Sequence, residues 1–259
     1  MPLTPYAEID ELLGNLLEYV RQILGKNLTG FYLYGSLVTG DFDGESSDID
    51  LLAVTAADIE FRDFDRLQKM HDDFVSEHPQ WDDRIEIAYV SVAALRTFKS
   101  HRSQIAVISP GEPFHIKEAG KDWLINWWVV REKGVAIFGP PPATLIELIS
   151  KEEFVQAVRE QAKEWGEWIS CLFKRKEQAY AILTMCRALY ACQNGEQASK
   201  QKAAQWAQEH LPQWASLIQK ALVWREAWRD DAVDHMATFP DTVRFVHFVI
   251  DRIGEVKAR

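Results

Sequence analysis

The sequence has few cysteines and no long hydrophobic run. Its three cysteines, Cys171, Cys186 and Cys192, have no CxxC spacing and no neighbouring histidine cluster. We therefore expect reduced thiols and no zinc site. No apolar run approaches the roughly 18 residues of a membrane span, and the first residues lack the basic and apolar regions of a signal peptide. These absences predict a cytoplasmic protein that has no membrane partner.

Positive charge is also scarce, because 29 lysines and arginines face 39 aspartates and glutamates, for a net charge of −10. Nucleic-acid binding needs clustered Lys and Arg against the phosphates, so we expect no nucleic-acid partner. An acidic chain instead attracts small cations. The sequence leaves the oligomeric state open.

The most informative stretch is an apolar strand, a Gly-Ser turn, a polar loop and a second strand that opens with Asp48-Ile49-Asp50. Side chains at i and i+2 share one face of a strand. Asp48 and Asp50 are therefore expected side by side, with Ile49 in the core. Two close carboxylates repel each other unless cations neutralise them, and Mg²⁺ takes oxygen ligands of this kind. We predict that Asp48 and Asp50 bind two Mg²⁺ ions.

The turn before this strand contains Gly35 and Ser36. Glycine permits a tight turn, and the N–H groups that follow suit a phosphate at the start of a short helix. We expect Gly35 and Ser36 to hold the phosphates of a nucleoside triphosphate, with Ser47 also in the nucleotide site. An isolated Asp-x-Asp is usually an ordinary polar strand end. The full arrangement resembles the signature of the nucleotidyltransferase superfamily that includes polymerase beta and the aminoglycoside adenylyltransferases.

A further acid follows on the next strand, where residues 84–90 alternate polar and apolar side chains. Ile85, Ile87 and Tyr89 face one way, and Glu86 projects from the opposite face. An exposed strand glutamate is the ordinary interpretation. Nucleotidyl transfer needs a base near the acceptor hydroxyl, so we predict that Glu86 accepts this proton and also contacts metal.

The chain is expected to fold as two domains. Gly139 and the three prolines after it form the clearest linker. We predict a nucleotidyltransferase domain over residues 1–140, of α+β class with a mixed sheet and flanking helices, and an all-α bundle over residues 141–259. The first domain has expected helices at 4–24, capped by Thr4, 60–77, 91–99 and 121–133, strands at 30–34, 48–55, 84–90 and 135–138, and a loop at 100–119.

The second half has five expected helices, and turn and capping signals mark their ends. Ser150 and Glu153 form a capping box, Gly195 suits a helix end, and Ser199 is a helix cap. The helices are predicted at 150–173, 177–193, 199–211, 213–229 and 240–256.

The C-terminal half narrows the resemblance, through the segments 183–190, 199–200 and 203–207 and through Leu211-Pro212. It is similar to the helical domain of the aminoglycoside (3″)(9) adenylyltransferases, which modify streptomycin and spectinomycin. Residues 126–140 look like the segment that joins the two domains in those enzymes. The resemblance implies Mg²⁺-dependent transfer of AMP from ATP to a hydroxyl of a small cationic antibiotic.

Particular residues follow from this resemblance. Arg187 and Lys200 match the basic residues that meet the ATP phosphates, and cations suit that role. Trp168 and Glu177 fall near the positions of a tryptophan and an acid that line the drug site. The ordinary alternatives are surface cations, a core tryptophan and a solvated glutamate in the first turn of a helix.

The sequence also departs from the family pattern. An acid expected in the drug-contacting stretch is replaced by the basic region at 173–176, and Trp224 is the candidate for an aromatic residue beside adenine. The acceptor could therefore be another small metabolite or a protein side chain. A non-catalytic nucleotide-binding scaffold is a third hypothesis, but it gives no physical need for three repelling acids.

Overall fold

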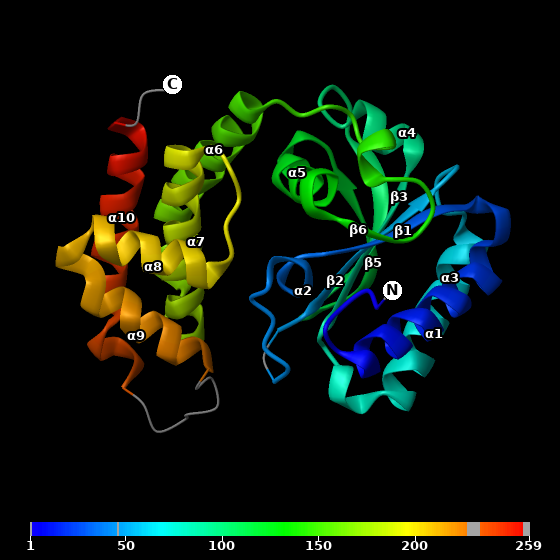
Figure 1. The fold of residues 1–259 in the computed structure, drawn as a ribbon, viewed down its shortest axis with the longest axis horizontal. Coiled ribbons are helices and arrows are strands. Elements are labelled where there is room, and N and C mark those ends of the chain that lie inside the picture. The colour runs from blue at the N-terminus through cyan, green and yellow to red at the C-terminus, as the bar shows by residue number, and fades with distance from the viewer. Residues whose placement is uncertain (1, 46, 227–233, 256–259) are drawn as a thin grey trace. The chain divides into compact units, whose positions relative to one another are not determined.

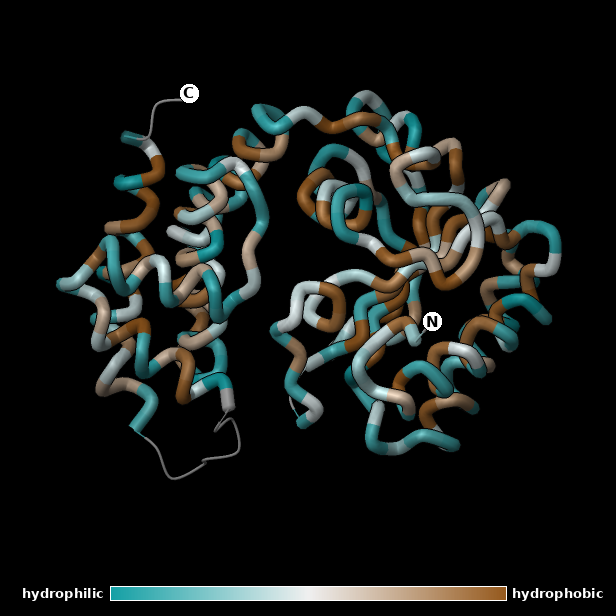
Figure 2. The backbone as a smooth tube through the Cα atoms, viewed as in Figure 1, coloured by the Kyte–Doolittle hydropathy of each residue, from teal (hydrophilic) through white to brown (hydrophobic). Residues whose placement is uncertain are grey.

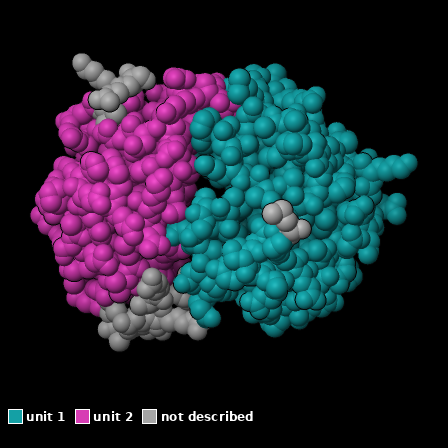
Figure 3. Space-filling view, in the orientation of Figure 1, with its two compact units in different colours: residues 1–148 teal, residues 149–259 magenta. Residues whose placement is uncertain are grey.

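A computed structural model of the chain describes residues 2–45, 47–226 and 234–255. The chain forms two compact units, Met1–Leu148 and Ile149–Arg259, coloured separately in Figure 3. Within the described ranges, no helix is both long enough and apolar enough to cross a membrane.

Unit 1 is built on a six-stranded sheet with the strand order β5-β4-β3-β2-β1-β6. Strands β2 and β3 are parallel, and the other neighbours are antiparallel, which confirms the predicted mixed sheet. The strands are β1 (Leu28–Tyr34), β2 (Ile49–Thr55), β3 (Ile85–Ser91), β4 (Ser103–Ser109), β5 (Glu112–Ala119) and β6 (Val135–Phe138).

Helices cover both faces of this sheet, with α1 and α3 on one side and α5 on the other (Figure 1). Helix α3 joins β2 to β3, as the crossover between parallel strands requires. The helices of unit 1 are α1 (Ala7–Leu24), α2 (Ser36–Thr39), α3 (Phe61–Glu77), α4 (Val92–Thr97) and α5 (Leu124–Lys133).

The core of unit 1 lies between the sheet and the helices α1 and α3. Ile49 and Ile87 are both fully buried there, which confirms the predicted faces of their strands. Figure 2 shows hydrophobic and hydrophilic positions alternating along both helices, as the helical spacing of the apolar residues predicts. Each buried aliphatic side chain contributes about 1.5–3 kcal/mol, so the strand that carries the two aspartates is anchored by its apolar neighbours.

Two local predictions for unit 1 were wrong. The expected loop at 100–119 is the hairpin of β4 and β5. Pro110 and Gly111 indicated a loop, but they form the hairpin turn, where Gly111 has φ 81°. Thr4 does not cap α1, because its hydroxyl donates to Asp10 Oδ1 at 2.8 Å and the helix begins at Ala7.

All the described regular elements of unit 2 are helices. They are arranged around α7, which contacts the other four long helices. The capping box of Ser150 and Glu153, the αL conformation of Gly195 and the cap by Ser199 are confirmed. The predicted ends at 227–229 and at 256 lie outside the described residues. The long helices are α6 (Lys151–Trp168), α7 (Arg175–Asn194), α8 (Lys200–His210), α9 (Ala215–Glu226) and α10 (Phe239–Glu255).

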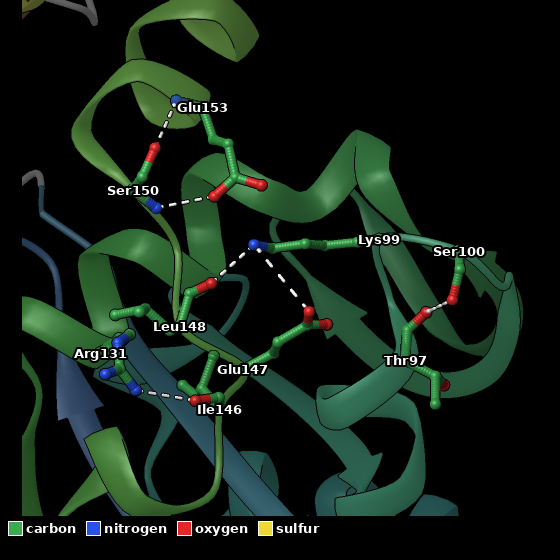
Figure 4. Close-up of polar contacts among 9 residues, drawn as sticks. All are labelled: Thr97, Lys99, Ser100, Arg131, Ile146, Glu147, Leu148, Ser150 and Glu153. Carbon is green, nitrogen blue, oxygen red and sulfur yellow. Dashed lines mark hydrogen bonds and ion pairs between the residues drawn. The ribbon is translucent and has the colours of Figure 1, made fainter.

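The segment between β6 and α6 is bound to unit 1 (Figure 4). Arg131 Nη1 donates to the carbonyl of Ile146 at 2.7 Å, and Lys99 Nζ donates to that of Leu148 at 2.6 Å. These contacts explain why the compact units divide after residue 148, whereas the sequence suggested a boundary after residue 140.

Candidate functional site

Three neighbouring strands bring the candidate acids into register. Asp50 in β2 pairs with Glu86 in the parallel strand β3, and with Tyr34 in the antiparallel strand β1. Cross-strand partners share one face of a sheet. The three side chains therefore lie on the face opposite α1 and α3. Asp48 directly precedes β2, and its charge lies close enough to Glu86 to affect the pKa of that residue.

Gly35 lies directly against this row of acids. Its φ is 74°, and a Cβ atom built on it would lie 1.8 Å from Asp50 Oδ2. Glycine is therefore required both by the backbone conformation and by the position of the carboxylate. The short helix α2 starts at Ser36, and the N–H groups of Val38 and Thr39 donate to the Gly35 carbonyl at 3.3 and 3.1 Å. The N–H groups of the first two helical residues are those that a helix leaves without an internal partner. Gly35 and Ser36 thus lie beside Asp50 with backbone donors nearby.

Ser47 holds the loop that leads to Asp48. It is buried, its hydroxyl accepts a hydrogen bond from the Asp43 N–H at 3.0 Å, and its carbonyl accepts one from Arg84 Nη2 at 2.7 Å. The guanidinium also lies 4.6 Å from the centre of the Trp81 ring. These contacts of Ser47 stabilise the loop, and its predicted contact with nucleotide stays a prediction.

The Glu86 side chain is partly buried. Burial raises the pKa of Glu86 above its ordinary value, and the nearby charges of Asp48 and Glu112 add to this increase. A hydrogen bond from the Tyr34 hydroxyl to Oε1, at 3.4 Å, opposes it, as does the Lys117 ammonium group. A carboxylate with a raised pKa accepts a proton more readily than a solvated one, which suits a general base.

The three acids fit a metal that arrives with a substrate better than a resident one. Within the described ranges, no group of three or more His, Cys, Asp or Glu side chains is arranged to hold a metal ion. Mg²⁺ is commonly bound by one or two carboxylates together with substrate phosphates. Asp48 and Asp50 offer the hard oxygen ligands of such a site, and a triphosphate would supply the remaining ligands.

Sequence reasoning missed Tyr34 and Lys117. Strand register alone would have indicated Tyr34, because the residue opposite Asp50 faces the same side. Lys117 was hidden in the expected loop at 100–119. In β5 it pairs with Ile105, and Val107 two residues further pairs with Ala88, so Lys117 shares the face of Glu86.

In unit 2, helix α7 exposes a single stripe. Between residues 178 and 192 every position is buried except Tyr180, Thr184 and Arg187, which follow helical spacing. Glu177 lies on the same face, one turn earlier. The stripe therefore unites two of the residues predicted from the resemblance, and Tyr180 and Thr184 are the members that sequence reasoning missed.

Two more predicted residues lie beside this stripe. Trp168 is 49% exposed, and Trp165 packs against both Trp168 and Tyr180, at 5.8 and 5.7 Å between ring centres. Lys200 Nζ lies 5.2 Å from the centre of the Tyr180 ring. Of the predicted residues, Lys200 thus contacts the Tyr180 ring directly, and Trp168 is connected to it through Trp165.

Two candidates have structural contacts of their own. Glu177 Oε2 accepts a hydrogen bond from the Lys174 N–H at 2.9 Å, as the acid of a capping box. Trp224 is 9% exposed, and the Arg175 guanidinium lies 5.0 Å from its ring centre. The Trp224 side chain is therefore mostly covered, which weakens its candidacy as a stacking partner for adenine.

Comparisons with known proteins match each half of the chain to a domain family. The family described as "Nucleotidyltransferase domain" matches residues 13–122, and "Aminoglycoside adenylyltransferase, C-terminal domain" matches residues 144–252. Two relatives named aminoglycoside (3″)(9) adenylyltransferase, from Escherichia coli and Shigella flexneri, are each 27% identical over 96% of this chain and 97% of their own length.

The fold is similar to that in a crystal structure of the spectinomycin adenyltransferase AAD(9) from Enterococcus faecialis with ATP and spectinomycin. The TM-score is 0.72 at 17% sequence identity, over 95% of this chain and 99% of that one. The two matched domain families lie in the same order as units 1 and 2. Residues 13–122 thus match a nucleotidyltransferase domain family, residues 144–252 match the C-terminal domain family of the aminoglycoside adenylyltransferases, and nearly the whole chain is similar to the aminoglycoside (3″)(9) adenylyltransferases.

Proposed function

We propose that this chain transfers AMP from ATP to a hydroxyl group of an aminocyclitol or aminoglycoside antibiotic, and releases pyrophosphate. The observation that carries the proposal is the register of Asp50 with Glu86 beside the turn at Gly35. The relatives' names and the bound ATP and spectinomycin of the similar structure support the choice of both substrates. Such an activity would give antibiotic resistance and would be exercised in the cytoplasm, where ATP is available.

The proposed reaction is an in-line displacement at the α-phosphorus of ATP. The acceptor oxygen forms a bond to this phosphorus, the bond to the pyrophosphate oxygen breaks, and the acceptor proton passes to the Glu86 carboxylate. Asp48 and Asp50 would hold the metal, and Glu86 would be a further ligand. Two Mg²⁺ ions would supply charge stabilisation at the attacking and leaving oxygens. Gly35, Ser36 and Ser47 orient the triphosphate.

Four residues of unit 2 are proposed to take part in substrate binding. Arg187 and Lys200 would offset the charge of the triphosphate, since both are cations on the exposed side of α7 or next to it. Trp168 and Glu177 would bind the acceptor, the first through its exposed ring and the second through its charge. Glu177 Oε2 accepts a hydrogen bond from the Lys174 N–H. The other carboxylate oxygen, Oε1, would therefore bind an ammonium group of the acceptor.

A second candidate keeps the chemistry and changes the acceptor to another small metabolite or a protein side chain. Two observations favour it. Lys174, Arg175 and Lys176 are consecutive cations where an acid was expected, and the Lys117 ammonium lies near Glu86. Both disfavour an acceptor with several positive charges.

A pyrophosphate-release assay with Mg²⁺ and ATP separates the two candidates. The proposal predicts release that depends on spectinomycin or streptomycin, and protection of a sensitive host that carries the gene. The Glu86→Gln chain is the matched control in both experiments. Its release should be about 10²- to 10⁴-fold slower, and it should not protect the host. Tight Mg²⁺-ATP binding without release on either drug would instead favour a different acceptor.

A further inference from the structure

The Glu86 carboxylate on β3 has a hydrogen-bonding side chain on β1, two strands away in the sheet. The Tyr34 hydroxyl donates to Glu86 Oε1 at 3.4 Å, across β2, which lies between their strands. Among the residues that the structure describes, Tyr34 is the one whose side chain donates a hydrogen bond to the Glu86 carboxylate. Oε1 is thereby engaged, and Oε2 remains for another partner.

The Tyr34 ring is held firmly enough to orient another group. It is 8% exposed and sits at the end of β1, next to the turn at Gly35. Burial raises the pKa of Tyr34 well above its ordinary value, and the charges of Glu86 and Asp50 raise it further. The hydroxyl therefore stays protonated and donates.

Glu86 needs such a partner because its other neighbours do not fix its orientation. Asp48 repels it, and Lys117 attracts it without a direct contact. The terminal torsion of a glutamate is broad, so a carboxylate held by charge alone samples many orientations. Proton transfer requires the accepting oxygen within hydrogen-bond reach of the acceptor hydroxyl.

We propose that Tyr34 is a positioning residue that holds Glu86 Oε1, so that Oε2 faces the hydroxyl group of the acceptor. The inference rests on the proposed function of Glu86 as the base. Tyr34 touches no reacting atom in this scheme and acts through Glu86. Its removal should therefore lower kcat and leave KM for ATP unchanged.

The chain offers a matched control on the same strand. Tyr32 lies two residues before Tyr34, is fully buried and donates its hydroxyl hydrogen bond to the Pro140 carbonyl at 2.7 Å. Tyr32→Phe and Tyr34→Phe each remove one buried hydroxyl from β1. Only the second removes a hydrogen bond to Glu86.

The test measures kcat and KM for the wild-type chain, for Tyr34→Phe and Tyr32→Phe, and for each combined with Glu86→Gln. We expect Tyr34→Phe to lower kcat on the order of 10-fold, as for a lost hydrogen bond to a charged group. Tyr32→Phe should keep the wild-type kcat. In the Glu86→Gln background Tyr34→Phe should have little further effect, because residues that act as a unit are not additive.

Unchanged kcat in Tyr34→Phe, or an equal further loss in the Glu86→Gln background, would overturn the inference. If the wild-type chain transfers no AMP, the proposed function fails separately. Crystal structures of the wild-type and Tyr34→Phe chains then decide the positioning role. A changed or disordered Glu86 carboxylate in the variant supports it, and an unchanged carboxylate contradicts it.

Discussion

Gly35 and Asp50 are so close that no side chain larger than hydrogen fits between them. A Cβ atom on Gly35 would lie 1.8 Å from Asp50 Oδ2. The Asp50 carboxylate on β2 can therefore occupy its position only because the turn between β1 and α2 carries a glycine. This contact brings the backbone N–H groups of the turn next to the proposed metal ligand.

Gly35→Ala should abolish AMP transfer, because the new methyl group must displace the Asp50 carboxylate. Gly40→Ala is the matched control, since Gly40 also has a positive φ, of 75°, but no atom within 4 Å of a built Cβ. Gly40 has the left-handed αL conformation, so Gly40→Ala carries a strain of roughly 1–2 kcal/mol. Gly35, with ψ −145°, lies outside that region, so Gly35→Ala carries a backbone strain of about 1–3 kcal/mol in addition to the clash with Asp50. Activity assays on the folded variants compare the two changes, and equal activities would mean that the Asp50 contact is unimportant.

His71 should make unit 1 sensitive to acid. It is 4% exposed, its Nε2 is 2.9 Å from the Tyr89 hydroxyl, and burial lowers the pKa of His71 to about 4. Between about pH 6.5 and pH 4 the unfolded chain binds a proton that the folded chain does not, so stability falls as the pH falls. The loss between pH 7 and pH 5 should be about 2 kcal/mol.

Urea unfolding at pH 7 and pH 5 measures this loss. His71→Gln should remove most of the pH dependence assigned to this site, and His101→Gln, which changes an exposed histidine, should not. An identical pH dependence in the His71→Gln and wild-type chains would exclude His71 as its source.

Lys117 should select against polycationic acceptors. Its ammonium group shares the face of Glu86 and affects its pKa. Lys117→Gln should lower KM for a cationic drug by about 5-fold at most, because charge interactions at partly exposed sites contribute up to about 1 kcal/mol. The effect should weaken with salt. Lys121→Gln, a matched change at an exposed lysine, should leave KM unchanged. If both variants had the same KM as the wild-type chain, Lys117 would not be part of the acceptor site.

ATP binding should depend on unit 2 through Lys200. Lys200→Gln is expected to weaken ATP binding about 10-fold, as for a lost charge-assisted contact with phosphate. Lys202→Gln removes a lysine two positions along α8, whose Nζ lies 3.4 Å from Glu196 Oε1 instead. Calorimetry on the two folded variants distinguishes them. Wild-type affinity in Lys200→Gln would show that this lysine does not contact the nucleotide.

Local patterns predicted much of this structure. Strand alternation placed Ile49 and Ile87 in the core and left Glu86 on the opposite face, because side-chain direction in a strand depends only on residue parity. Helix caps such as Ser199 were also evident, because capping requires a particular residue type at a particular position.

The remaining features depend on pairing between distant segments. Glu86 lies opposite Asp50 only because β2 and β3 pair in parallel, and no local pattern gives that register. The hairpin of β4 and β5 was missed because turn residues are common to hairpins and loops. Consequently Lys117 was not considered, and the binding of residues up to Leu148 to unit 1 was also unexpected.

The most direct test is transfer of labelled AMP from ATP to spectinomycin or streptomycin by the wild-type, Asp50→Asn and Glu86→Gln chains, with the exposed change Asp58→Asn as control. We expect transfer by the wild-type and Asp58→Asn chains, none by Asp50→Asn, and a loss of about 10² to 10⁴-fold for Glu86→Gln, as for removal of a general base. Normal turnover by folded Asp50→Asn, or an unchanged kcat in Glu86→Gln, would contradict the assignment of these two carboxylates to the chemistry.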